Sequence, residues 1–208
     1  MLRHTRPGPV PLVPEILLLQ ADGDVFALWE RAGELPYWAY PWPGGQALAR
    51  HLLDHPGIVR GRRVLDLAAG SGLVAVAAAL AGAAAVNAAD VDPLAHAAIL
   101  LNAAANAVQV RLEPGDLLAA PPPGPCGPWW DVVLVGDASY EPALAGRVRA
   151  YCAAAAAAGA LVLIGDPGRD YLRPQGLREL SRHQVPTPHG LERAAVTPAT
   201  VWRLLPPS

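Results

Sequence analysis

The sequence predicts an α/β protein built on a doubly wound, mostly parallel sheet with helices on both faces. Between residues 61 and 165, short apolar runs alternate with segments of helical composition, which is the pattern of repeated strand–helix units. The apolar runs lack polar–apolar alternation, as expected of parallel strands covered on both sides. The 208 residues are 52% hydrophobic and 16% charged. That length and composition predict one domain with a sizeable core and exclude general disorder.

Each predicted element follows from this alternation. Strands are expected at residues 63–68, 84–89, 108–112, 131–135 and 160–165, and helices at 46–53, 72–81, 93–106 and 142–158. The C-terminal part is less regular. There the composition suggests a helix at 177–181, followed by an antiparallel hairpin of residues 193–196 and 200–204.

The N-terminal part has a different character. Closely spaced prolines predict a flexible lead over residues 1–13, either disordered or extended, and a short strand or helix is expected at residues 14–20. Asp24 is placed to cap a helix over residues 25–32. Residues 35–45 carry four aromatic side chains in a frame of proline and glycine, which argues against a helix.

Composition narrows the class of protein. The net charge of −2 gives no sign of a nucleic-acid or anionic-membrane partner. Cys126 and Cys152 match no metal or redox spacing, which favours a reduced protein without a metal site. The apolar run at 16–19 is too short for a signal core or a membrane span. We therefore expect a soluble cytoplasmic protein.

The stretch at residues 64–72 predicts a strand, a tight turn and the beginning of a helix. Glycines such as Gly70 and Gly72 let backbone N–H groups approach a nucleotide-like ligand. The turn formally matches the dinucleotide fingerprint G-x-G-x-x-A. Asp66 at the strand end, however, fits a cofactor with an amino-acid group, whose ammonium a carboxylate attracts. The alternative role for Asp66 is to cap the loop.

Further acids follow the next strands. Asp90 lies about 20 residues past the glycines, where an acid can bind both ribose hydroxyls. Asp92 is better placed as the N-cap of the next helix, although the two acids could exchange roles. Asp116 follows the third strand and could accept a hydrogen bond from an adenine amino group. It could equally be a simple turn residue.

The fourth strand leads into Asp137 and, three residues later, Tyr140. In an open α/β sheet the reacting substrate lies beyond the carboxyl ends of the strands. A carboxylate can bind and orient an amine there, and the aromatic side chain offers a cation-binding face or a hydroxyl. The alternative is a capped helix start, with Glu141 in the first turn.

Together these motifs resemble the class I, seven-β-strand S-adenosylmethionine-dependent methyltransferases, and more narrowly the electron-transfer flavoprotein β-subunit lysine methyltransferase family. The broad resemblance rests on residues 64–72, 90–93 and 136–140. The narrower one rests on Pro36-Tyr37-Trp38-Ala39, Trp42-Pro43-Gly44-Gly45-Gln46-Ala47-Leu48, Ile164-Gly165-Asp166-Pro167-Gly168-Arg169 and Thr200-Val201-Trp202.

The resemblance implies a Rossmann-like, seven-stranded methyltransferase domain over residues 14–208. An N-terminal helical and aromatic extension would cover 14–60, and the core 61–208. It implies methyl transfer from S-adenosylmethionine to a lysine of the electron-transfer flavoprotein β-subunit. The implied catalytic residues are Asp137 and Tyr140, and the implied cofactor-binding residues are Trp42, Asp66, Gly70, Gly72, Asp90, Asp116 and Asp137.

Some positions depart from the family pattern, and other functions remain open. Ala68 and Ala69 replace a Gly-Ser pair, and Tyr40-Pro41 replaces an Ile-Tyr pair.

Asp166 and Arg169 could contact substrate or form a loop clamp. A small-molecule amine N-methyltransferase would use the same cofactor site. A binding module without turnover and a nicotinamide dehydrogenase are the remaining alternatives.

Overall fold

The computed structural model describes residues 5–21, 31, 33, 35–119, 130–187, 192 and 194–206. These residues contain a seven-stranded sheet with the order β5-β4-β3-β6-β7-β9-β8 and a separate two-stranded sheet, β1-β2. The strands are β1 (Thr5–Val10), β2 (Val13–Ala21), β3 (Arg63–Leu67), β4 (Ala85–Ala89), β5 (Arg111–Leu112), β6 (Val132–Gly136), β7 (Leu161–Asp166), β8 (Leu177–Pro186) and β9 (Val196–Leu204). The predicted seven-stranded, mostly parallel sheet is confirmed.

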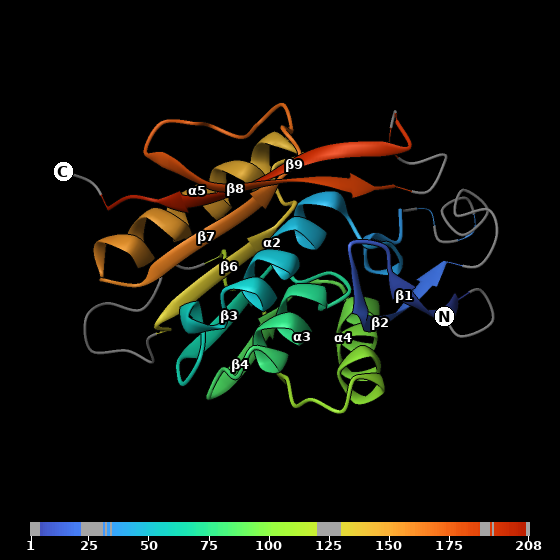
Figure 1. The fold of residues 1–208 in the computed structure, drawn as a ribbon. Helices are drawn as coiled ribbons and strands as arrows, with labels where there is room; N and C mark the ends of the chain where they lie inside the picture. Colours follow the sequence, from blue (N-terminus) through green and yellow to red (C-terminus); the bar gives the residue numbers. More distant parts are fainter. Residues whose placement is uncertain are drawn as a thin grey trace.

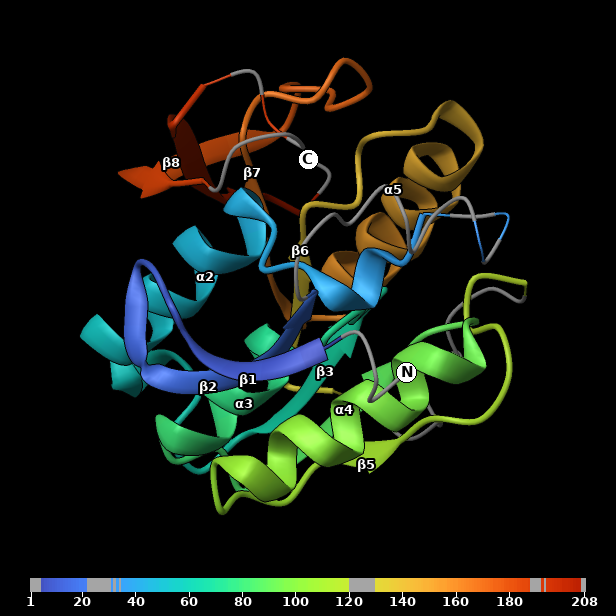
Figure 2. The ribbon, with the colours of Figure 1, turned by 90° about the vertical axis from the view of Figure 1, so that its right-hand side faces the viewer.

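Strands β3 to β7 pair in parallel, and β9 joins antiparallel to both β7 and β8. The helices are α2 (Pro43–Asp54), α3 (Leu73–Leu80), α4 (Pro93–Ala105) and α5 (Pro142–Ala157), with short 3₁₀ turns η2 (Tyr37–Ala39) and η3 (Pro56–Ile58). Figures 1 and 2 show α2 and α3 on one face of the sheet and α5 on the other, the doubly wound arrangement.

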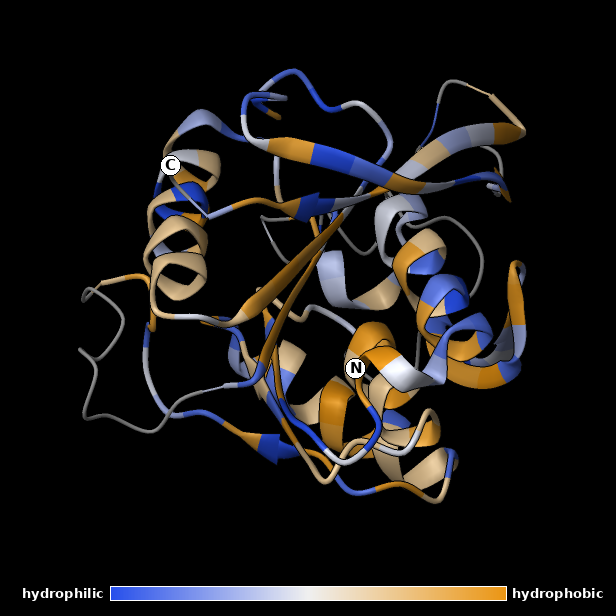
Figure 3. Cartoon of the chain, turned by 60° about the vertical axis from the view of Figure 1, so that its left-hand side comes forward, coloured by the Kyte–Doolittle hydropathy of each residue, from blue (hydrophilic) through white to orange (hydrophobic). Residues whose placement is uncertain are grey.

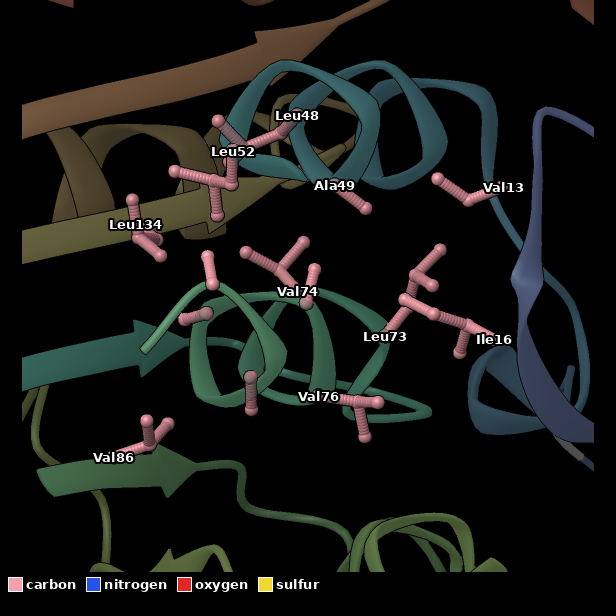
Figure 4. Packing of buried hydrophobic residues seen from close by; sticks show 14 of the residues in the cluster. Val13, Ile16, Leu48, Ala49, Leu52, Leu73, Val74, Val76, Val86 and Leu134 are labelled. Carbon is pink, nitrogen blue, oxygen red and sulfur yellow. The ribbon is translucent and has the colours of Figure 1, made fainter. Parts of the chain in front are cut away.

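Two apolar cores fill the space between these layers. One packs α2, α3 and β2 against the sheet, and Figure 4 shows Leu48 of α2, Val74 of α3, Leu134 of β6 and Ile16 of β2 within this cluster. The other packs α5 against the opposite face. The central strands are apolar along their length (Figure 3), which matches their burial between two helix layers.

Glycines bring the beginning of α2 into backbone contact with the sheet. A Cβ on Gly165 of β7 would lie 2.1 Å from the carbonyl oxygen of Gly44, and a Cβ on Gly136 would lie 3.0 Å from the Cα of Gly45. Only glycine permits such an approach. The Trp-Pro-Gly-Gly and Gly-Asp-Pro-Gly-Arg segments are therefore two sides of one close contact, which holds the helix N-terminus at the carboxyl ends of β6 and β7.

The structure corrects two predictions at the C-terminal end. Residues 177–181 are not a helix but the first half of β8, and the hairpin pairs β8 with a continuous β9 instead of residues 193–196 with 200–204. The sequence of β8 is mostly polar because it is the edge strand of the sheet. Charged residues are common on such edges, where they discourage pairing with other chains.

The N-terminal part also differs from the prediction. Residues 5–10 and 13–21 form the antiparallel hairpin of β1 and β2, so the described part of the lead is extended and paired and not flexible, and residues 14–20 take the strand option. Prolines are compatible with β1 because it is an edge strand that pairs only with β2. Within residues 35–45, η2 forms one 3₁₀ turn and α2 already begins at Pro43.

Three sequence predictions lie outside the described residues. They are Asp24, its helix over residues 25–32 (of which the structure describes only residue 31), and Cys126. Across the described part of the chain, no helix combines the length and apolar character needed to cross a membrane.

Candidate active site

A cavity of about 550 Å³ opens at the carboxyl ends of the central strands. Its walls come from the segment before α2, the turn after β3, the ends of β4 and β6, and the loop after β7. The structure places seven of the eight predicted site residues on its lining: Trp42, Asp66, Gly70, Asp90, Asp116, Asp137 and Tyr140. Gly72 is not among the described lining residues.

The turn after β3 has a left-handed backbone at three positions. The φ angles are +56° at Ala68, +53° at Gly70 and +75° at Gly72. An added Cβ on Gly70 would meet nothing closer than 3.9 Å, whereas one on Gly72 would lie 3.1 Å from the Ile99 side chain of α4. Gly70 therefore leaves room in the cavity, and Gly72 serves the packing of the turn on α4. Ala68 adopts its angle against the preference of a residue with a Cβ.

Asp66 is fully enclosed at the end of β3. Its Oδ2 accepts a hydrogen bond of 2.9 Å from the N–H of Ala75 in the first turn of α3, which agrees with the capping role. Burial raises the pKa of Asp66 well above its ordinary value, opposed in part by this hydrogen bond. Because Asp66 also lines the cavity, its carboxyl group can serve both the helix and a ligand.

Asp90 closes the glycine turn against the end of β4. Its Oδ2 accepts from the Gly70 N–H at 2.8 Å, and its Oδ1 accepts from the Asp92 N–H at 3.0 Å. Asp92 caps α4 by accepting from the N–H of Leu94 at 2.7 Å, as predicted. Asp92 therefore lies at the N-cap of α4, whereas Asp90 is hydrogen-bonded to the glycine turn after β3.

Asp116 lies farther along the same wall. It accepts from the Leu118 N–H and forms an ion pair with Arg147 of α5, which also lines the cavity. Hydrogen bonding to Arg147 lowers the pKa of Asp116 and keeps it ionised. The carboxylate thus has local partners, as the turn interpretation expects, while it remains on the cavity wall.

Asp137 follows β6 with a left-handed φ of +62°, and its side chain is almost completely buried. Its Oδ2 accepts from the Gly44 N–H of α2 at 2.9 Å. Arg169 donates its Nε–H to Oδ1 at 2.7 Å and an NH2 hydrogen to Oδ2 at 3.3 Å. Burial raises the pKa of Asp137, and the Arg169 guanidinium opposes that rise. Asp137 therefore contacts both the N-terminus of α2 and the guanidinium of Arg169.

Arg169 also binds a second carboxylate, because it donates to Oε1 of Glu192 at 2.7 Å. The guanidinium lies 5.7 Å from the centre of the Trp42 ring. The backbone of Arg169 is held by Asp166, whose Oδ1 accepts from the N–H groups of Gly168 and Arg169 at 2.6 and 2.8 Å. Of the two predicted roles, contact with substrate or clamping of the loop, these hydrogen bonds correspond to the loop clamp. Burial raises the pKa of Asp166 to about 6.

Aromatic side chains form the wall above these charges. The rings of Tyr37 and Tyr140 stack with centres 4.8 Å apart, and each is about 40% exposed. Trp42 donates its Nε1–H to the Tyr37 carbonyl at 2.8 Å, and Tyr40 meets its ring edge-on at 4.7 Å. The predicted Tyr140 therefore belongs to an exposed aromatic rim and not to the buried charge network.

Sequence reasoning did not single out Glu192, Tyr40 or Asn102. Glu192 comes from the connection between β8 and β9, far from the motifs. Asn102 of α4 donates to the Ser71 carbonyl at 2.8 Å and so supports the glycine turn. The one available signal was an asparagine inside an otherwise apolar helix, because a buried amide must find hydrogen-bond partners.

The chain is similar to known methyltransferases in sequence and in fold. A family model described as ribosomal protein L11 methyltransferase (PrmA) matches residues 48–121, the part with the glycine turn and Asp90. The chain is 38% identical to the electron transfer flavoprotein beta subunit lysine methyltransferase of Xenopus laevis, over 99% of this chain and 86% of the relative. It is 37% identical to the Homo sapiens protein of the same name, over 94% and 76% of the two chains.

Among solved structures, the 16S rRNA N2 G1207 methyltransferase (RsmC) from T. thermophilus, in complex with AdoMet and guanosine, superposes with a TM-score of 0.61. The match covers 98% of this chain and 50% of that one at 19% identity. At this identity the likeness concerns the fold alone. The comparison of function therefore rests on the relatives whose sequences match nearly the whole chain.

Proposed function

This chain belongs to the electron transfer flavoprotein beta subunit lysine methyltransferase family, and we propose that it methylates a lysine side chain of that flavoprotein subunit. Its cofactor is S-adenosylmethionine, and the chain is a methyltransferase. The observation that carries the proposed role of the site is the buried Asp137–Arg169 pair at the carboxyl end of β6, beneath an exposed aromatic rim.

The residues present fit this cofactor. The cavity of about 550 Å³ suits a ligand of nucleoside size. Asp66 and Asp90 are cavity-lining acids whose side-chain oxygens accept hydrogen bonds from backbone N–H groups among the described residues. We assign Asp66 to the amino-acid portion of S-adenosylmethionine, Asp90 to the ribose and Asp116 to the adenine. Gly70 lets the cofactor approach the turn after β3, and Trp42 lines the end of the cavity where the methyl group is transferred.

S-adenosylmethionine supplies an electrophilic methyl group, so the nitrogen lone pair forms the new N–C bond, the C–S electron pair passes to sulfur, and one proton leaves the nitrogen. The protein must therefore deliver a neutral amine in the correct orientation. A lysine amine has an ordinary pKa near ~10.4, and an enclosed site lowers it. Asp137 accepts an N–H of this amine, Arg169 keeps the carboxylate ionised, and the Tyr140 ring lines the approach.

The experiment combines the purified chain, the purified flavoprotein β subunit and S-adenosylmethionine with a labelled methyl group. We expect label on lysine of the β subunit, located by peptide mass spectrometry. The chain contains no lysine, so methylated lysine cannot arise from the enzyme itself. Label on small amines of an extract, with none on the subunit, would contradict the proposal and favour a small-molecule N-methyltransferase.

The matched variant is Asp137→Asn, which keeps an acceptor for the Gly44 N–H but removes the charge. We expect methyl transfer to fall by roughly 10- to 150-fold, because a charge-assisted hydrogen bond to the amine is worth roughly 1.5–3 kcal/mol. Affinity for S-adenosylmethionine, measured by calorimetry, should change by less than threefold. Full activity of this variant would show that Asp137 does not handle the amine.

A further inference from the structure

Two aromatic side chains at the rim of the cavity are left partly exposed to solvent. Tyr37 of η2 is 40% exposed and Tyr140 after β6 is 39% exposed, and both line the cavity. Their rings stack with centres 4.8 Å apart and planes 20° from parallel. Single exposed apolar residues are ordinary, but large rings gathered at the edge of a cavity mark a surface that contacts a ligand.

Neighbouring residues hold Tyr37 in place. Its carbonyl accepts the Nε1–H of Trp42 at 2.8 Å, and the Trp42 ring lies 5.8 Å from the Tyr37 ring. The next residue, Trp38, is 3% exposed and packs with Ala95 and Ala98 of α4. Tyr37 is therefore anchored on both sides, and its exposed ring is a fixed part of the rim.

Tyr37 also connects the two ends of the cavity. A Cβ on Gly70, in the turn assigned to the cofactor, would lie 3.9 Å from the Tyr37 carbonyl oxygen. The ring of Tyr37 stacks on Tyr140, which follows Asp137 by three residues. Tyr37 therefore spans from the glycine turn to the loop after β6. The methyl group passes from the one to the other, so the side chain that carries the reacting amine lies next to this ring pair.

We propose that the Tyr37 ring binds the methylene stem of the lysine, beside Tyr140, and so selects an amine on a long apolar chain. This inference rests on the proposed function. The side chain of Asp137 is only 1% exposed, so the amine must be inserted deeply, and the methylene groups behind it lie against the exposed rim. Burial of one CH2 group is worth about fourfold in affinity. Tyr37 forms no bond and transfers no proton in this role.

The test is Tyr37→Ala in the full chain. We expect KM for the β subunit to rise about tenfold, the effect of exposing roughly two CH2 groups, because Tyr140 remains as the other ring. The stem is bound alike in the ground state and in the transition state, so kcat should stay within about threefold of wild type. The affinity for S-adenosylmethionine, measured by calorimetry, should change little. Tyr37→Phe keeps both rings, and its KM should match that of wild type.

A pair of small amines tests the selection by stem length directly. n-Butylamine carries the four-carbon chain of a lysine side chain, whereas ethylamine is two carbons shorter and has nearly the same basicity. We expect n-butylamine to compete with the β subunit for wild type about tenfold more strongly than ethylamine does. Tyr37→Ala should lose most of this preference, and Tyr37→Phe should keep it.

Tyr171→Ala is the matched control. Tyr171 is 38% exposed, like Tyr37, but it lies in the β7–β8 connection and is not a described lining residue of the cavity. This change should alter neither KM nor the preference between the two amines. An unchanged KM in Tyr37→Ala, a matching loss of cofactor affinity, or an equal amine preference in wild type and Tyr37→Ala would overturn the inference. A wild-type enzyme that is inactive on the β subunit would instead contradict the proposed function on which the inference rests.

Discussion

The two halves of the cavity bind their carboxylates in different ways. In the cofactor half, at the ends of β3 and β4, the carboxylates of Asp66 and Asp90 accept hydrogen bonds from backbone N–H groups of the described residues. In the reaction half, at the ends of β6 and β7, Asp137 and Glu192 share the guanidinium of Arg169. In the first half Asp66 and Asp90 rely on neutral donors and only Asp116 pairs with a cation, Arg147, at its edge, whereas the second half is a charge network with a cation at its centre.

The difference corresponds to what each half has to do. A positively charged cofactor is attracted by carboxylates that no protein cation neutralises. A reacting amine must instead be neutral, so a strongly negative pocket that stabilised its ammonium form would slow the reaction. Arg169 limits that stabilisation while keeping Asp137 ionised. We therefore expect substitutions in the two halves to separate cofactor affinity from protein stability.

The largest expected effect is that of Arg169→Met. It leaves two almost fully buried carboxylates without their cation, and breaking a buried ion pair costs roughly 3–5 kcal/mol. Without Arg169 the pKa of Asp137 rises further, so the loss of unfolding free energy should be larger at pH 8 than at pH 5.5. Urea unfolding at both pH values measures it.

The control for this substitution is Arg63→Met. Arg63 forms an ion pair with Asp131, but both side chains are 40% or more exposed. An exposed pair contributes about 0–1 kcal/mol. Equal losses in the two variants would show that the network around Arg169 is no more stabilising than an ordinary surface pair.

The next effect is that of Asp66→Asn, which should act in opposite directions on binding and stability. The folded-state pKa of Asp66 is raised above its unfolded value, so the folded protein binds the proton more tightly and loses stability as pH rises through this range. The amide oxygen can still accept from the Ala75 N–H. We expect unchanged or higher unfolding free energy at pH 8, and at least a tenfold (~1.4 kcal/mol) loss of S-adenosylmethionine affinity.

Asp166→Asn is the matched comparison for binding. Asp166 is also fully buried, with a pKa raised to about 6, but it is not a described lining residue of the cavity. Its amide variant should likewise lose the pH dependence of stability that the acid causes, and its affinity for S-adenosylmethionine should stay within threefold of wild type. A similar loss of affinity in both variants would remove Asp66 from the cofactor site.

The smallest effect is expected for Arg147→Ala. The pair with Asp116 lies on the cofactor side, but its side chains are 44% and 33% exposed. Exposure and salt screening limit its contribution to at most ~0.5 kcal/mol of unfolding free energy. Thermal unfolding and calorimetric titration should show little change, and a loss above ~1 kcal/mol would mean that the cofactor half depends on a cation as well.

Much of the fold follows from local patterns, and the errors have identifiable causes. Buried parallel strands such as 63–67 and 132–136 are continuous apolar runs, so composition reveals them. Residues 177–181 carry helix-forming polar residues, and only their pairing with β9 makes them a strand. Residues 5–10 contain closely spaced prolines, which suggest a flexible segment, and it is their pairing with β2 that makes them a strand; β2 in turn is hydrogen-bonded to α4.

The candidate site could likewise be predicted from local sequence only in part. Asp66, Asp90 and Asp137 stand directly after strands, so the topology alone predicts that they share one edge. Arg169 has a role that depends on Glu192, which arrives from the β8–β9 connection 23 residues later in the chain. The beginning of α2 contacts β7 only because glycines from two distant segments meet there. Such contacts between distant segments leave no periodic signal in the sequence.

Asn102 gives the N-terminal hairpin a part in the enzyme's architecture. Its amide accepts from the Leu19 N–H of β2 and donates to the Ser71 carbonyl of the glycine turn. Asn106, one turn later, binds both backbone groups of Leu17. A shortened chain that began after residue 21 would strand a buried amide directly beneath the cofactor turn. The N-terminal hairpin therefore supports the cofactor turn, although none of its residues is among the described lining residues of the cavity.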